Sequence, residues 1–475
     1  MPQAAMTPSP PPLFLRDIEL AGRRTDVAVS ADGRVAAIGG LRPRPGDTVV
    51  EGHGGALLPG LADRHVHVMA LAASLESVNC GPPGIRADKV LMDALRSRAA
   101  ASAPGTWIRG VGYHESVAGP LDRDRLDAMV DRRPVRVQHR SGGLWIVNSP
   151  GARLLGLDDP GAVLPAGAER DVDGRVTGRL WRLDSWLRDR LGPAEVPDLE
   201  SVGRLYASYG VTTLHDATPE LADDTVVELS RALNDRRLPQ HIAFLGALRR
   251  PRPGERWVRG PYKLLPPDHD TWPYDELLNR VQAARGADRR PVAVHCVTRE
   301  SLVLTLVALR EAGPVPGDRI EHAAVVPPEL YADLRELGVR VVTQPGFVAE
   351  RGDAYLAEVE PDDLPHLYPY ASLLAAGIPV SASSDAPYSS PDPWAVVRAA
   401  RDRRTPSGRI LGTGERVDAA TALSGLFTRP VIRPGDDADL CLLHAPWRVA
   451  CEEPGAGLVR MTMRQGRVAY SGPRL

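Results

Sequence analysis

Residues 60–68 read GLADRHVHV, and the apolar run ALLPGL at 56–61 leads into them. In a β-strand successive side chains point to opposite faces, so His65 and His67 would lie on the same face. Two imidazoles on one face supply half of the ligands of a metal site. Taken alone, the pair is more typical of a strand edge with solvated or core histidines, so its meaning depends on residues further along the chain.

The composition is that of a globular protein that acts on small molecules. With 475 residues, 43% of them hydrophobic, the chain can bury a large core and has room for about two to three domains. The formal net charge is -2 and no basic block occurs, which argues against nucleic acid or an anionic membrane as a partner. The N-terminus does not resemble a signal peptide, and no apolar run reaches the roughly 20 residues that span a bilayer. We expect a cytoplasmic protein with a small-molecule substrate and consider a homodimer as its assembly.

Both ends of the chain show the alternation of apolar and polar residues that is typical of antiparallel strands. Near the N-terminus the alternating segments are residues 13–20, 26–29 and 35–39, and near the C-terminus they are 438–443, 458–463 and 467–470. Neither end has enough strands to cover its own apolar face. We therefore predict one small β-sandwich domain built from both ends, residues 1–58 and 411–475.

Between these ends, strand-like runs alternate with helical ones, which indicates repeated βα units and a parallel sheet. Eight such runs occur: the one with His65 and His67, and those at 211–215, 241–245, 262–265, 292–295, 319–322, 339–344 and 379–385. Eight units predict an α/β fold of the (β/α)8 TIM barrel type over residues 59–410, with its active site at the C-terminal ends of the strands.

Residues 79–196 interrupt this rhythm between the first and second strands. The segment is too long for a single crossover, so we expect an insertion with its own structure. Because it leaves from the C-terminal end of the first strand, it should cover the catalytic face and act as a lid and specificity element.

Metal-ligating residue types recur at the ends of the predicted barrel strands. These residues are His65, His67, Lys263, His295, His322 and Asp385. Individually, His295 or His322 is as typical of a core histidine, and Asp385 as typical of a turn or a helix cap. Together they favour a metal site, because imidazole with carboxylate suits zinc or a related divalent ion.

The sequence resembles the metal-dependent amidohydrolase superfamily, and within it the branch of the N-substituted formamide deformylases, over nearly its whole length. The motifs that carry the resemblance are LPGLADRHVH (58–67), SYGVTTLHD (208–216), VHC (294–296), RIEHA (319–323), SDAP (384–387) and PGDDADL (434–440). One departure is Gly143, which stands where this branch has a histidine.

The resemblance implies two zinc ions. His65, His67 and Asp385 would hold one ion, His295 and His322 the other, and a carboxylated Lys263 would bridge them. A lysine amine reacts with carbon dioxide only when it is deprotonated, and burial near cations favours that form. If Lys263 is unmodified, a one-metal site of His65, His67, His295 and Asp385 is the alternative.

The expected reaction is hydrolysis of a non-peptide carbon–nitrogen amide bond. A metal ion lowers the pKa of a bound water from about 15.7 towards 7, and Asp385 would shuttle the proton of that water to the leaving nitrogen. Candidate substrate contacts are His114, Glu115, His139, Arg140 and Gln344. Alternatives are a cyclic amidohydrolase, deaminase or lactonase that uses the same site, or a catalytically silent binding protein.

Overall fold

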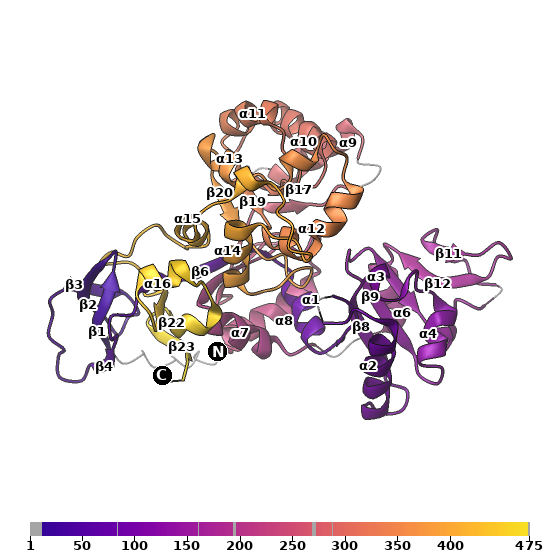
Figure 1. Ribbon diagram of the computed structural model, residues 1–475, viewed down its shortest axis with the longest axis horizontal. Helices are drawn as coiled ribbons and strands as arrows, with labels where there is room; N and C mark the ends of the chain where they lie inside the picture. The colour runs from indigo at the N-terminus through magenta and orange to yellow at the C-terminus, as the bar shows by residue number, and fades with distance from the viewer. Residues whose placement is uncertain are drawn as a thin grey trace. The chain divides into compact units, whose positions relative to one another are not determined.

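The computed structural model describes residues 12–82, 84–159, 161–192, 196–267, 272–286 and 288–473. The chain divides into two units (Figure 1). One comprises Met1–Val68 with Leu199–Leu475, and the other comprises Met69–Asp198.

Both ends of the chain form four-stranded sheets in the first unit. The N-terminal sheet has the order β3-β2-β1-β4 and consists of β1 (Leu13–Leu20), β2 (Arg23–Val29), β3 (Val35–Gly39) and β4 (Thr48–Glu51). The second sheet has the order β23-β22-β21-β5 and consists of β5 (Leu57–Pro59), β21 (Leu440–Leu443), β22 (Val459–Arg464) and β23 (Arg467–Ser471). The N-terminal segment that runs into the metal-type motif thus pairs with strands from the far end of the chain.

One apolar core joins these two sheets. Leu15 and Val27 of the N-terminal sheet belong to the same buried cluster as Leu442, Met461 and Met463 of the second sheet. Two sheets that share a core in this way bury apolar faces that neither could cover alone.

The predicted barrel strands are present as parallel strands in two open sheets. The first sheet has the order β15-β14-β13-β6 and consists of β6 (Leu61–Val66), β13 (Val211–Asp216), β14 (His241–Phe244) and β15 (Trp257–Arg259). The second follows chain order and consists of β16 (Tyr262–Leu264), β17 (Val292–Cys296), β18 (Arg319–His322), β19 (Arg340–Thr343) and β20 (Val380–Ala382).

The closed ring of eight strands that we predicted is therefore not present as one continuous sheet. The fourth predicted strand, 262–265, corresponds to β16, which pairs with β17, whereas β15 was not predicted and pairs with β14, and the chain breaks at Gly260 and Pro261 between them. Proline has no N–H group and cannot continue a strand ladder, which accounts for the break. Backbone hydrogen bonds still cross both seams: Lys263 N donates to Leu245 O (3.1 Å) at one, and at the other Asp385 N donates to His65 O (2.8 Å) and His67 N donates to Ala386 O (2.9 Å).

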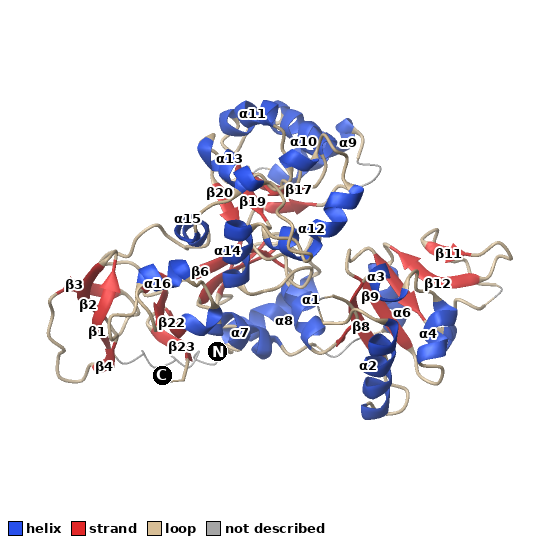
Figure 2. Ribbon diagram, viewed as in Figure 1, coloured by secondary structure: helices blue, strands red, loops and turns tan. Residues whose placement is uncertain are grey.

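Helices follow most of the parallel strands. They are α7 (Leu199–Ser208), α8 (Asp223–Asn234), α9 (Tyr274–Arg285), α10 (Arg299–Glu311), α11 (Tyr331–Glu336), α12 (Gly346–Glu358), α13 (Tyr370–Ala375), α14 (Pro393–Asp402), α15 (Ala419–Ser424) and α16 (Trp447–Glu452). Figure 2 shows α9, α10, α11 and α13 around the strands of the five-stranded sheet. None of the helices in the described ranges combines the length and apolar character needed to cross a membrane.

The α10 helix illustrates how the sequence determines these elements. Thr298 and Ser301 form a reciprocal capping box at its N-terminus, which satisfies backbone N–H groups that the helix itself leaves unpaired. Leu302, Leu306 and Leu309 recur at helical spacing and are buried. The helix thereby covers one face of the sheet that carries the predicted ligands.

The second unit contains the predicted insertion and has its own core. Its sheet has the order β11-β12-β10-β9-β8-β7 and consists of β7 (Val78–Asn79), β8 (Ile108–Tyr113), β9 (Val135–His139), β10 (Leu144–Val147), β11 (Ala168–Arg170) and β12 (Val176–Trp181). Its helices include α2 (Asp88–Ala101), α3 (Glu115–Ala118), α4 (Arg123–Met129), α5 (Ser149–Leu154) and α6 (Asp184–Leu191), while α1 (Val68–Leu75) starts at the boundary. Leu91 and Leu95 pack in one buried cluster with Ile108 and Val135. The place of this unit over a catalytic face stays a prediction.

The shared core of the terminal sheets gives a test of the fold. Leu442 is 0% exposed, so Leu442→Ala should lower the free energy of unfolding by about 2–5 kcal/mol through the cavity it leaves. Val468 lies on the same sheet at 46% exposure, and Val468→Ala should change stability by about 0.5 kcal/mol or less. Denaturant unfolding of both variants measures the difference, and equal effects would contradict the shared core.

Candidate metal centre

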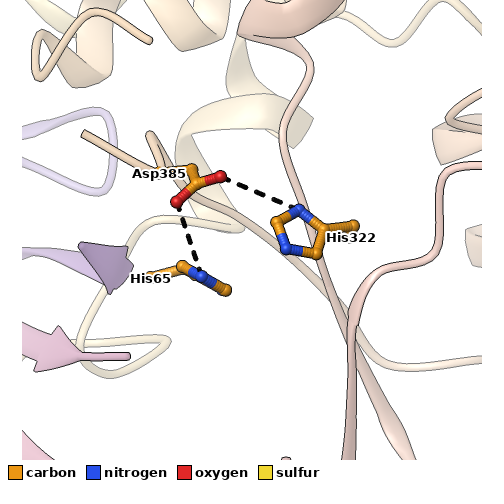
Figure 3. A group of neighbouring side chains, drawn as sticks. All are labelled: His65, His322 and Asp385. Atoms are coloured by element: carbon orange, nitrogen blue, oxygen red, sulfur yellow. Dashed lines mark ion pairs between the residues drawn. The ribbon is translucent and has the colours of Figure 1, made fainter. Parts of the chain in front are cut away.

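Three predicted ligands from distant parts of the sequence converge in the first unit. His65 lies on β6, His322 ends β18 and Asp385 follows β20, and one ligand atom of each lies within 4.8 Å of the others. Asp385 stands between the two rings, with Oδ1 3.5 Å from His65 Nε2 and Oδ2 3.9 Å from His322 Nδ1 (Figure 3). All three side chains are buried.

Left-handed backbone brings two of these residues into the site. The side chains of Arg319 and Glu321 share one face of β18, so a regular strand would turn the next residue, His322, to the opposite face. His322 has φ 65° and Asp385 has φ 58°, and this deviation redirects both side chains. Left-handed φ is uncommon for residues other than glycine, although His and Asp tolerate it better than most. Such local strain is typical of functional sites and depends on the surrounding packing.

His67 and His295 lie beside this group. His67 Nε2 is 3.2 Å from Asp385 Oδ1, and the ring centroids of His295 and His322 are 4.4 Å apart. Both rings are half-buried. The structure therefore brings together all five of the predicted imidazole and carboxylate ligands.

Lys263 reaches the same interior from β16. Within the described residues its buried Nζ has no hydrogen-bond partner. Burial lowers the pKa of the Lys263 amine, although Glu321 and Asp385 act in the opposite direction. An unpartnered buried amine with a lowered pKa fits either a neutral amine or a modified one, because an isolated buried ammonium is costly.

The protonation states suit a divalent cation. Burial holds the pKa values of His65 and His322 well below their ordinary range, so both rings are neutral and keep a lone pair for a metal. Burial would raise the pKa of Asp385, but the attraction of His65 and the close approach of His67 outweigh it, and the net pKa is lowered. Neutral imidazoles with a carboxylate are the donors that zinc takes in proteins, so the residues present fit such an ion.

The rings of His65, His67 and His322 also each have a hydrogen-bond partner on the Nδ1 atom. His65 Nδ1 contacts Glu321 Oε2, His67 Nδ1 lies 3.2 Å from Thr218 Oγ1, and His322 Nδ1 lies 2.9 Å from Gln344 Oε1. Gln344, which we predicted as a pocket residue, is 0% exposed and also donates to Ser383 Oγ at 3.0 Å. Its described contacts are thus those of a residue that orients His322.

Sequence reasoning missed a buried network beneath Asp385. Ser384 Oγ donates to Asp63 Oδ2, and the Ser384 N–H donates to Asp63 Oδ1 at 3.1 Å. The Tyr206 hydroxyl donates to Asp63 Oδ2 at 2.9 Å. Asp63 lies two residues before His65 in the motif, and this spacing was its only signal, because its partners come from β20 and α7.

The other predicted substrate contacts lie in the second unit. His139 Nε2 is 3.0 Å from Glu115 Oε2, and the ring of His139 lies 6.0 Å from that of His114. The Arg140 N–H donates to Tyr113 O at 2.8 Å. These four residues gather at the ends of β8 and β9, and their contact with a substrate stays a prediction.

A further group of metal-ligating types occurs at His241, Asp437 and Asp439. Its carboxylates already have cationic partners, since Arg464 lies 3.3 Å from Asp439 and Arg34 lies 3.5 Å from Asp437. Arginines at these distances neutralise the charge that would attract a cation. The group around Asp385 is therefore the better candidate.

Comparison with known proteins shows the family of this chain. A model of the amidohydrolase family matches residues 48–470. The chain is 24% identical to the N-substituted formamide deformylase of Arthrobacter pascens over 481 residues, which cover 89% of this chain and 88% of that protein.

Two solved structures share the fold. An uncharacterized metal-dependent hydrolase from Pyrococcus furiosus is similar with a TM-score of 0.68 and 21% identity, over 91% of this chain and 99% of that one. Another from Pyrococcus horikoshii OT3 has a TM-score of 0.70 and 18% identity, over 96% of this chain and 99% of that one.

The network beneath Asp385 can be tested through stability. Tyr206→Phe removes a hydrogen bond to a fully buried carboxylate without changing the ring, so the free energy of unfolding should fall by about 1–3 kcal/mol. Tyr470→Phe, on a half-buried ring of β23, is the matched control and should have little effect. Thermal unfolding of the two variants provides the comparison, and an unchanged midpoint for Tyr206→Phe would show that Asp63 does not depend on this bond.

Proposed function

This chain belongs to the amidohydrolase family, and on that premise we propose that it is a metal-dependent hydrolase that cleaves an amide carbon–nitrogen bond of a small molecule. The observation that carries the proposal is the convergence of His65, His322 and Asp385 in a buried group with neutral rings and an ionised carboxylate. The similarity to N-substituted formamide deformylase favours an N-substituted amide as the substrate class.

We propose that the site holds two zinc ions. His65, His67 and Asp385 would hold one ion, and His295 and His322 the other. Lys263 would join them as a carbamate, which forms when the neutral amine adds to carbon dioxide and releases a proton. The unpartnered, buried Nζ of Lys263 supports this assignment. When bound, such ions lower the pKa of a water molecule and polarise the carbonyl group of a substrate.

Asp385 is the proposed proton shuttle. Its pKa is lowered on balance, so the side chain is a carboxylate that can accept a proton at neutral pH. Its buried Oδ1 makes no hydrogen bond of good geometry with the described residues, which leaves this atom open to an attacking water. An amide nitrogen leaves poorly as an anion, so the same carboxyl group would then deliver the proton to it.

The fold supports this arrangement if the two open sheets act as halves of one (β/α)8 barrel, as we propose. The hydrogen bonds from Lys263 to Leu245 and from Asp385 to His65 cross the two seams where the halves would meet. In a barrel of this kind, residues at the C-terminal ends of the strands form the active site. His65, His295 and His322 all occupy such ends.

Metal content is the first test of this function. After treatment with a chelator and dialysis against zinc, the wild-type protein should hold about two ions per chain, and removal of the ions should abolish amide hydrolysis. His65→Ala should lose bound metal because the ring lies at the centre of the group. His444→Ala, outside the site, is the control. A folded wild-type protein that binds no divalent ion would refute the proposal.

Asp385→Asn tests the proton shuttle. Asparagine tolerates the left-handed backbone at this position, so the variant should fold, while its turnover number should fall by about 10²–10⁴-fold because the amide cannot take up the proton. Turnover is measured on a panel of N-substituted formamides, hydantoins, lactams and aminopurines, with metal content recorded in parallel. The exposed Asp362→Asn is the control. Wild-type turnover in a metal-loaded Asp385→Asn enzyme would remove Asp385 from the mechanism.

A further inference from the structure

Glu321 is a fully buried carboxylate that stands between a predicted ligand and an arginine. One of its oxygens, Oε2, contacts His65 Nδ1, and the other, Oε1, accepts from Arg319 Nε. Glu321 is 0% exposed, and both of its partners are also buried. The proposed metal set does not include either Glu321 or Arg319.

Arg319 extends this contact across three strands. Its Nη2 atom donates to the backbone oxygen of Arg64, the residue before His65, at 2.7 Å. Its Nη1 atom lies 3.0 Å from His215 Nδ1 on β13. The guanidinium therefore ties β18 to both β6 and β13. Because Glu321 and Arg319 are two residues apart on one strand, they share a face and meet without further support.

The contact with Glu321 determines which nitrogen of His65 carries the proton. An ionised carboxylate can only accept hydrogen bonds, so Nδ1 of the neutral ring must carry the hydrogen. The lone pair is then on Nε2, the atom that lies 3.5 Å from Asp385 Oδ1. The ring is thus held in the tautomer that can ligate an ion beside Asp385.

We propose that Glu321 is a positioning residue that fixes the tautomer of His65 and strengthens it as a metal ligand, and that Arg319 holds the Glu321 carboxylate in place. This inference rests on the proposed metal site and adds to it two residues that do not themselves touch the ion. A carboxylate that accepts the outer N–H of a metal-binding histidine raises the basicity of the ring.

The partners of the other rings make the role of Glu321 specific. Thr218 contacts His67 Nδ1 and Gln344 contacts His322 Nδ1 through neutral oxygens, whereas His65 is the one of these three rings whose Nδ1 hydrogen-bond partner is a carboxylate. The ion pair of Glu321 with Arg319 contributes little net stability to the fold, because the desolvation of two buried charges offsets much of their attraction. Loss of the Glu321 charge alone leaves Arg319 buried and unpaired and lowers stability as well, so the effect that marks Glu321 as a positioning residue is the change in metal affinity.

Metal binding by Glu321→Gln is the test. The glutamine keeps an oxygen for His65 Nδ1 but removes the charge, so we expect cobalt(II) and zinc to bind the chelator-treated full-length variant about 10–100-fold more weakly than wild type. The visible absorption spectrum of the cobalt(II) form should also shift, because the ligand field of His65 changes. If Glu321→Gln does not fold, the double variant Arg319→Met/Glu321→Gln removes the whole ion pair and should show the same loss of affinity.

Asp318→Asn is the matched control on the same chain segment. Asp318 is also a buried carboxylate and lies 2.9 Å from Arg285, but its other hydrogen bonds go to the backbone of Val292 and Val315 rather than to a histidine. It should lower stability and leave metal affinity and the cobalt spectrum unchanged.

The outcomes separate this inference from the proposed function. Absence of metal binding by wild type would refute the metal site itself. Wild-type affinity and spectrum in a folded Glu321→Gln or double variant would overturn the role of Glu321 while the metal site stands. An equal loss of affinity in Asp318→Asn would also overturn it, because the effect would then follow from a general weakening of the fold.

Discussion

The buried contact between Asp63 and Ser384 is the constraint on which the candidate site depends. Asp63 lies on β6 in one open sheet, and Ser384 follows β20 in the other. No continuous ladder joins these strands in the described structure, so their separation depends on this side-chain contact and on the backbone bonds from Asp385 N to His65 O and from His67 N to Ala386 O. A histidine and an aspartate that are 320 positions apart in the printed sequence meet only because this seam is held. Without this contact, His65 and Asp385 would not be held close together.

The charges of the buried groups determine what the site between the two sheets can bind. Several ionisable groups are buried around it, among them Lys263, Glu321 and Asp385, and a buried charge is costly unless it is paired. The histidines avoid this cost by staying neutral, and Glu321 avoids it through Arg319. Lys263 and the Oδ1 atom of Asp385 are left without a hydrogen bond among the described residues. These two groups without hydrogen bonds therefore lie where the proposed ions would supply positive charge and accept lone pairs.

Much of this arrangement could be predicted from the sequence, because local pattern sets local structure. The predicted strands at 211–215, 292–295 and 319–322 agree with β13, β17 and β18 to within one residue, and each contains β-branched residues, which favour strands. The short strand β15, with the break after it at Gly260 and Pro261, was not predicted, because its three residues give too short a pattern to recognise. The outer partners could not be predicted, because Glu321, Gln344 and Asp63 acquire their roles only from side chains on other strands.

The insertion begins directly after His67, one of the proposed metal ligands. His67 ends the metal-type motif, and the second unit starts at Met69. Hydrogen bonds from two backbone N–H groups hold the chain just before the second unit begins. The His67 N–H donates to Ala386 O at 2.9 Å, and the Val68 N–H donates to Asp216 Oδ2 at 2.9 Å, so two bonds secure the chain before it leaves.

The returning chain is secured to the same strand. It re-enters the first unit at Leu199 in α7, and this helix carries Tyr206, whose hydroxyl binds Asp63 on β6. The returning end of the insertion is thus anchored to the strand that holds His65, and the departing end to Asp216 of β13 and to Ala386, by contacts within the first unit.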